Sequence, residues 1–229
     1  MKVLVIGGGG REHAVVKKLS ESPKINKIYC TPGNAGISQI AQCINIKATD
    51  IDGILKFVDE NPMDMVIVTP DDPLALGLVD KLNEKKIRAF GPVAKAAELE
   101  SSKAFSKNLM KKYKIPTGDF EIFDNAENAL KYLKDKKYPL VIKASGLALG
   151  KGVIIVSDQE QAEKTIDQMM RNDMFGTSGH TVIIEEFLQG PEVTVLAFTD
   201  GNTIKTMPSS QDHKRALDDD KGLNTGGMG

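Results

Sequence analysis

Short apolar runs alternate with amphipathic segments over the first hundred residues. The runs are typical of strands, and the segments, whose apolar residues recur every three or four positions, are typical of helices. Strands are predicted at residues 2–6, 27–30, 43–46, 65–69 and 87–90, and helices at 11–20, at 50–60 with Asp50 as N-cap, and after Pro73. Since strand and helix alternate, we predict an α/β fold with an open parallel sheet covered by helices on both faces.

The pattern changes near Glu100, where we place a domain boundary. A helix with a hydroxyl cap starts in the segment 101–107 and ends before Pro116, because proline disfavours helical backbone at the preceding residue. Further strands are predicted at 120–123, 138–143, 153–156, 181–187, 193–198 and 203–206, and helices at 125–134 and 158–170. A turn at 199–202 joins the last two strands as a hairpin. This second part is predicted to be α+β.

Composition narrows the functional classes. The chain has 229 residues, 41% of them apolar, and a net charge of −1 with acidic and basic residues mixed, so nucleic acid is not expected as a partner. Cys30 and Cys43 lack metal-site spacing and are expected to be two small buried residues in a reducing compartment. No apolar run suits a signal peptide or a membrane span, so we expect no membrane partner and a cytoplasmic location.

Three polar, glycine- or proline-containing turns follow strands of the predicted parallel sheet, at 7–10, 31–36 and 69–73. Ligands of such sheets bind beyond the carboxyl ends of the strands, so a phosphate or sugar is expected there. A dinucleotide fingerprint is disfavoured, because Glu12 and His13 occupy the positions where its third glycine would stand. No acidic residue follows Cys30 to bind a ribose hydroxyl.

A glycine-rich loop lies between two strands of the second part, from Ala144 to Val153. Glycine lets backbone N–H groups approach phosphate oxygens, and Lys143 and Lys151 add positive charge. The loop is not a Walker A motif, since Gly146 and Gly150 enclose only three residues and a strand follows. The loop by itself fits a flap over a polyphosphate and an ordinary hairpin with two solvated lysines equally well.

An acidic and apolar segment, Glu185-Glu186-Phe187-Leu188, ends the strand at 181–187. Such a strand end can offer adenine an apolar slot and backbone hydrogen bonds, and Glu192 can bind ribose hydroxyls. Two adjacent acids at a solvated strand end are the alternative. Together with the glycine loop, the segment favours nucleotide binding.

These motifs and several others resemble the phosphoribosylamine–glycine ligases, a family of ATP-grasp enzymes in purine biosynthesis. The resembling segments follow the family order along the chain: 5–14, 32–36, 102–105, 143–153, 184–192, 211–215 and 224–229. The resemblance implies a pre-ATP-grasp α/β domain at 1–100, the smaller ATP-grasp lobe with a linker helix at 101–190, and the start of a truncated larger lobe at 191–229.

The resemblance also implies a reaction. Glycine's carboxylate attacks the γ-phosphate of ATP, giving glycyl phosphate and ADP. The amine of phosphoribosylamine then displaces phosphate and forms glycinamide ribonucleotide. Positioning and charge compensation carry such chemistry, so no Ser, Cys or His base is needed.

Residue roles are implied position by position. The ATP-binding residues would be Lys103, Lys143, Gly150, Lys151, Gly152, Glu185, Glu186, Phe187, Leu188 and Glu192. The substrate-binding residues would be Gly9, Gly33, Asn34, Asp71, Asp212, His213 and Lys214. The catalytic residues would be Lys151, Asp212, Lys214 and Arg215, with the individual roles within 212–215 left unassigned.

The chain departs from the family pattern in three respects. Ser145 and Leu149 replace an aspartate and an alanine of the flap, and Asp71 replaces a glutamate. Residues 222–229 end the chain inside a glycine-rich loop, and family members continue beyond it. The Glu and Asn ligands of Mg²⁺ or Mn²⁺ are expected past Gly229, so no metal ligand is assigned here and the 229-residue chain is expected not to turn over.

Two other functions stay open at this stage. One is another ATP-grasp carboxylate–amine ligase, which the segment 211–215 disfavours. The other is a nucleotide-binding module without catalysis. The sequence does not indicate the oligomeric state.

Overall fold

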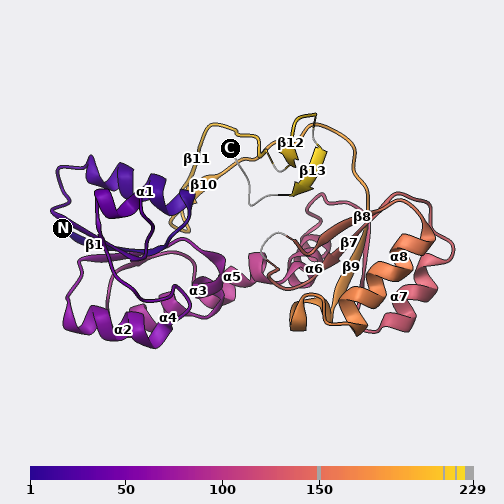
Figure 1. Ribbon diagram of the computed structural model, residues 1–229, viewed down its shortest axis with the longest axis horizontal. Coiled ribbons are helices and arrows are strands. Elements are labelled where there is room, and N and C mark those ends of the chain that lie inside the picture. The colour runs from indigo at the N-terminus through magenta and orange to yellow at the C-terminus, as the bar shows by residue number, and fades with distance from the viewer. Residues whose placement is uncertain (149–150, 214, 220, 225–229) are drawn as a thin grey trace. The chain divides into compact units, whose positions relative to one another are not determined.

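The structure, a computed structural model, describes residues 1–148, 151–213, 215–219 and 221–224 (Figure 1). The chain forms two compact units, Met1–Ser106 and Lys107–Gly229. Within the described ranges, no helix is long and apolar enough to cross a membrane.

The first unit is built on a five-stranded parallel sheet with the strand order β3-β2-β1-β4-β5. Its strands are β1 (Lys2–Gly7), β2 (Lys27–Pro32), β3 (Gln42–Cys43), β4 (Met65–Val68) and β5 (Ala89–Phe90). Its helices are α1 (Gly10–Ser20), the short η1 (Ile37–Gln39), α2 (Ile51–Glu60), α3 (Asp71–Ala75), α4 (Leu78–Glu84) and α5 (Ala94–Ser101). The predicted parallel sheet is confirmed.

Alternation along β1 creates two cores, one on each face of this sheet. Val3 and Val5 pack with Val16 of α1 on one face. Leu4 and Ile6 belong to a second core on the other face, with apolar residues of α2, α3 and α4. Successive side chains of a strand point to opposite faces, so a continuously apolar strand requires helices on both. Figure 1 shows α1 and α2 on opposite sides of the sheet.

Some predicted bounds in this unit are wrong. The strand expected at 43–46 is the two-residue β3, because Ile44 and Ile46 offer their carbonyl oxygens to the Thr31 hydroxyl at 3.0 and 2.6 Å. The helix expected after Pro73 is α4, and it is preceded by the short α3, which contains Pro73 because proline in a first turn is tolerated. Helix α5 was not predicted.

The second unit is built on an antiparallel sheet with the order β6-β9-β7-β8. Its strands are β6 (Phe120–Phe123), β7 (Leu140–Ala144), β8 (Val153–Val156) and β9 (Val182–Glu186). Its helices are α6 (Lys103–Tyr113), which begins in the first unit, α7 (Ala126–Leu133), α8 (Gln159–Ile166), and the short η2 (Asp167–Arg171) and η3 (Gly176–Gly179). Helices α7 and α8 cover one face of this sheet, as Figure 1 shows.

Two antiparallel hairpins follow this sheet along the chain. Strands β10 (Ala197–Thr199) and β11 (Ile204–Thr206) pair as predicted, and Asp200 accepts hydrogen bonds from the turn N–H groups of Asn202 and Thr203. The strand predicted at 193–198 is shorter than expected and begins at Ala197. The second hairpin, β12 (Arg215–Leu217) with β13 (Lys221–Asn224), was not predicted.

Candidate functional site

The first candidate site lies at the carboxyl ends of β1 and β4, which are neighbours in the parallel sheet. Glu12, in the first turn of α1, is 7% exposed and connects the two strand ends. Its Oε2 accepts the Gly9 N–H at 2.7 Å, and its Oε1 accepts the Thr69 hydroxyl at 2.7 Å. The Glu12 carboxylate holds the turn after β1 against the turn after β4. The N–H of Gly9 is used as a donor to this carboxylate.

The turn after β2 approaches the turn after β1 at the same edge. Gly33 has a positive φ of 73°, and its N–H donates to the Gly7 carbonyl at 3.1 Å. A Cβ on Gly8 would collide with the Gly33 carbonyl oxygen, so the two backbones meet without room for a side chain. Asn34 closes this contact, because its Nδ2 donates to the Gly8 carbonyl at 2.9 Å.

The predicted substrate residues of this unit therefore differ in their surroundings. Gly9, Gly33 and Asn34 come together in the contact between the first two turns. Asp71 is exposed at the start of α3, after β4. The structure brings all four to the carboxyl edge of the sheet, where Gly9, Gly33 and Asn34 are held by local hydrogen bonds.

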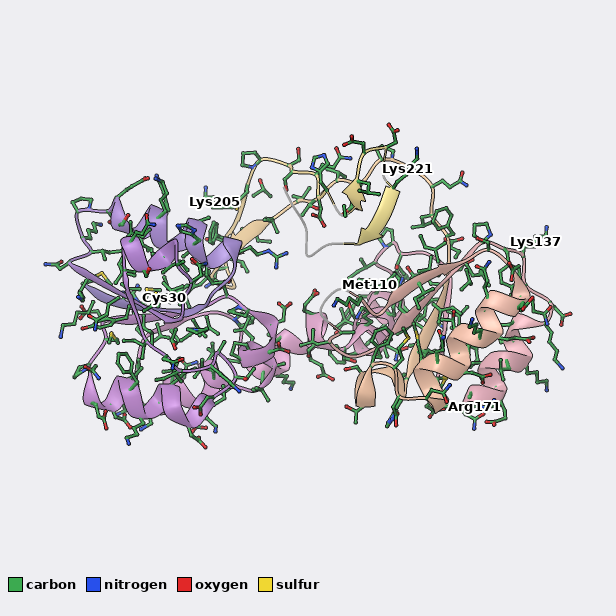
Figure 2. All side chains as sticks on the ribbon, viewed as in Figure 1. Cys30, Met110, Lys137, Arg171, Lys205 and Lys221 are labelled. Carbon is green, nitrogen blue, oxygen red and sulfur yellow. The ribbon has the colours of Figure 1, made fainter. Side chains whose placement is uncertain are left out.

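Cys30 lies under this edge and is fully buried (Figure 2). Its Sγ donates to the Gly7 carbonyl at 3.3 Å, and burial, followed by the nearby Cys43 and Glu12, raises the pKa of the thiol to about 12. Because the thiolate is the nucleophile, we expect Cys30 to resist iodoacetamide in the folded protein at pH 8 and to react after denaturation. Mass spectrometry of the modified peptides measures this, and rapid native alkylation at Cys30 would contradict it.

The second candidate site is a buried cluster of three charged side chains in the second unit. Glu185 of β9 is 8% exposed. Its Oε1 lies 2.7 Å from Nζ of Lys143, on β7, and its Oε2 lies 2.8 Å from Nζ of Lys107, on α6. We call these three residues the Lys–Glu–Lys cluster. One carboxylate between two ammonium groups leaves a surplus of one positive charge.

Strand register explains why two members of this cluster meet. Strands β7 and β9 are antiparallel neighbours, with Val141 opposite Glu185 and Lys143 opposite Ile183. Lys143 and Glu185 are therefore diagonal neighbours on one face of the sheet. Alternating residues such as Ile142 and Ile184 point to the other face and pack in the core under α7 and α8. Because Ile142 and Ile184 pack in the core on one face of the sheet, Lys143 and Glu185 lie on the opposite face.

Helix α6 supplies the third member. The Lys107 ammonium donates to the Thr117 hydroxyl at 2.6 Å and lies 5.2 Å from the centre of the Phe120 ring. Its contact with Glu185 Oε2 is an ion pair, and no described group donates a well-aligned hydrogen bond to that oxygen. The Lys107 ammonium is thus the charged partner of this buried oxygen.

The other predicted adenosine residues follow Glu185. Glu186 ends β9, and its carboxylate accepts the Asp119 N–H at 3.1 Å. Phe187 is 36% exposed and Leu188 is 64% exposed, so this edge offers apolar surface next to the charged cluster. Glu192 is exposed in the segment that returns from it.

The glycine loop is anchored on its first side. The N–H of Gly146 donates to the Ser178 carbonyl at 3.1 Å, and the Ser178 hydroxyl donates to the Leu147 carbonyl at 2.8 Å. A Cβ on Gly146 would collide with Ser178, which explains this glycine by close packing. Lys151 is exposed and Gly152 is buried. Gly150 lies outside the described residues.

The remaining predicted residues belong to two separate segments of the chain, the start of α6 and residues 212–215. Lys103 is the first residue of α6. Asp212 is half-buried, His213 is exposed, and Arg215 begins β12. Lys214 lies outside the described residues.

Sequence reasoning missed Lys107 and Glu12. Lys107 stands one helical turn after Lys103, and this i, i+4 spacing was an available signal for a second lysine on the same face. Glu12 was considered only as a misfit to a dinucleotide fingerprint. Its carboxylate at the start of a helix, opposite Thr69 at a neighbouring strand end, becomes informative only once the strand order is known.

Two domains of one enzyme family together match the whole chain. The phosphoribosylglycinamide synthetase N domain matches residues 1–100, and the ATP-grasp (A) domain of the same enzyme matches residues 101–229. The chain belongs to the phosphoribosylglycinamide synthetase family. This family assignment confirms the resemblance noted from the motifs and the expected ATP-grasp architecture.

Relatives in this family cover the whole chain. It is 52% identical over 229 residues to the phosphoribosylamine–glycine ligase of Caldanaerobacter subterraneus subsp. tengcongensis and 46% identical over 231 residues to that of Escherichia coli. It covers 55% and 54% of those two proteins, so it spans about half the length of these relatives.

Solved structures agree with the family. The crystal structure of phosphoribosylamine–glycine ligase from Thermotoga maritima matches with a TM-score of 0.84 and 32% identity, over all of this chain and 54% of that one. The biotin carboxylase domain of Hydrogenobacter thermophilus 2-oxoglutarate carboxylase matches with a TM-score of 0.73 and 20% identity, over 91% of this chain and 49% of that one. At that identity the second match shows the fold alone.

Proposed function

We propose that this chain is the nucleotide-binding part of an ATP-dependent ligase that joins glycine to phosphoribosylamine and forms glycinamide ribonucleotide. The observation that carries the proposal is the Lys–Glu–Lys cluster, because a surplus positive charge held beside an apolar strand end suits a nucleotide phosphate next to a base. The names of the relatives, phosphoribosylamine–glycine ligase, supply the substrates.

The residues of the second unit would divide the work on ATP. Lys143 would turn from Glu185 toward the phosphates, and Lys151 and Gly152 would cover them from the glycine loop. Phe187 and Leu188 would hold the adenine ring, with Glu185 and Glu186 at its edge and Glu192 at the ribose. Lys103 and Gly150 belong to the same proposal on sequence grounds.

The residues of the first unit would hold phosphoribosylamine at the carboxyl edge of the parallel sheet. Asp71, which is exposed, is the candidate closest to a ligand role, and Gly9, Gly33 and Asn34 shape the turns. The segment 212–215 is proposed as substrate-binding on sequence grounds alone. The proposal also includes domain boundaries near residues 100 and 190. It further includes a cytoplasmic location for the protein.

A divalent metal would offset the charge on the phosphates during transfer. Among the described residues, no three His, Cys, Asp or Glu side chains gather as metal ligands. Lysines and backbone N–H groups of this chain would bind and orient the phosphates of ATP.

Lys143→Ala tests the proposal. We expect at least about tenfold weaker ATP binding by isothermal titration calorimetry, because a lysine that compensates phosphate charge is removed. Lys137→Ala is the matched control, since Lys137 is an exposed lysine shortly before β7 (Figure 2) and should leave binding unchanged. Equal ATP affinity in the two variants would reject the proposed role of the cluster.

A further inference from the structure

Lys107 contacts the buried Glu185 in the Lys–Glu–Lys cluster. We propose that Lys107 is a positioning residue that keeps Glu185 paired, so that Lys143 can leave Glu185 and bind the nucleotide phosphates. The inference rests on the proposed nucleotide site. It concerns the movement of Lys143 from Glu185 to the phosphates when the nucleotide binds. Lys107 itself does not need to touch the nucleotide.

Glu185 needs a second positive partner because it is buried. A buried carboxylate is strongly disfavoured without a positive partner. If Lys143 were its one partner, its movement to a phosphate would leave Glu185 unpaired, and that cost would oppose binding. Lys107 lies 2.8 Å from the second carboxylate oxygen, so Glu185 keeps one ammonium neighbour throughout.

Lys107 is itself held in place for this role. Its side chain is 11% exposed, against 24% for Lys143, so Lys107 is the more enclosed of the two lysines. The Thr117 hydroxyl and the Phe120 ring fix its ammonium group, and Phe120 is opposite Glu185 in the β6–β9 register. Lys143 has a single ion pair among those of the described residues, with Glu185. The less enclosed lysine is therefore the one suited to move.

The charged groups around Glu185 come from two elements. Helix α6 contributes Lys107, while Lys111 of the same helix lies with its ammonium 5.9 Å from the centre of the Phe120 ring. Strand β7 contributes Lys143. On β9 itself, Glu186 is turned to the Asp119 backbone. Without Lys107, a carboxylate that loses Lys143 on binding would take up a proton from solvent and become neutral.

The test is calorimetric titration of ADP into the chain and its variants at pH 7.5, in two buffers of different ionisation enthalpy, which counts the protons taken up on binding. We expect Lys107→Met to bind ADP at least about tenfold more weakly and to take up about one proton more than the unsubstituted chain. Lys107→Arg keeps the charge and should restore both values. Lys112→Met, at an exposed lysine of the same helix, should match the unsubstituted chain.

The outcomes separate the two proposals. Lys143-dependent ADP binding with an unchanged proton count in Lys107→Met would overturn the role of Lys107 alone. ADP binding that ignores Lys143, or no binding by the unsubstituted chain, would overturn the nucleotide site and this inference with it. If Lys107→Met does not fold, Lys107→Gln makes the same comparison, because its amide carries no charge and can still donate to Thr117.

Discussion

Replacing Glu185 with leucine is expected to lower the free energy of unfolding by about 3–5 kcal/mol. The substitution leaves the ammonium groups of Lys107 and Lys143 facing each other across a buried space without their shared carboxylate. Breaking a buried ion pair from one side is costly because the remaining charge is neither solvated nor compensated. Here two charges of the same sign remain.

Urea unfolding followed by circular dichroism measures this loss, and amide hydrogen exchange in β7 and β9 assigns it to the second unit. Glu186→Leu is the matched control, since the neighbouring carboxylate is exposed and accepts a single backbone hydrogen bond. The control should cost at most about 1 kcal/mol. A Glu185→Leu variant as stable as the control would show that the cluster is not buried as described.

Replacing Ile184 with alanine is expected to cost about 2–5 kcal/mol of unfolding free energy. Ile184 is 1% exposed, on β9 between β6 and β7, and it packs in the core under α7 and α8. The truncation removes buried methyl and methylene groups and leaves a cavity that a rigid strand cannot close. Because Glu185 is the next residue, the same substitution should also weaken ADP binding.

Ile155→Ala gives the comparison within the same sheet. Ile155 lies on the edge strand β8 and is 44% exposed, so its truncation should cost about 1 kcal/mol or less. Urea midpoints of the two variants, with the slopes checked for equality, provide the measurement. Similar losses for both residues would place the core of the unit elsewhere.

Much of the fold could be read along the chain because local patterns and burial agree. Val3, Leu4, Val5 and Ile6 are consecutive apolar residues, so both faces of their strand are apolar. Such a strand belongs at the centre of a sheet between two helical layers. Likewise, Asp50 and Asn125 cap α2 and α7 as side-chain acceptors, which makes those helix starts local properties. Short edge strands were less predictable, since β3 ends where carbonyl groups turn to Thr31.

The candidate nucleotide site likewise combines features that the sequence predicts with contacts that it does not predict. Residue type and spacing were enough to predict the glycine loop with Lys143, the acidic strand end at Glu185, and their order along the chain. Three contacts became visible in the folded chain: Lys107 reaches Glu185 from α6, Glu12 joins Gly9 to Thr69, and Gly146 packs on Ser178. These contacts join residues from elements whose approach depends on strand register and helix packing. A burial pattern specifies which face of an element is covered, and the partner on that face is set by the assembled fold.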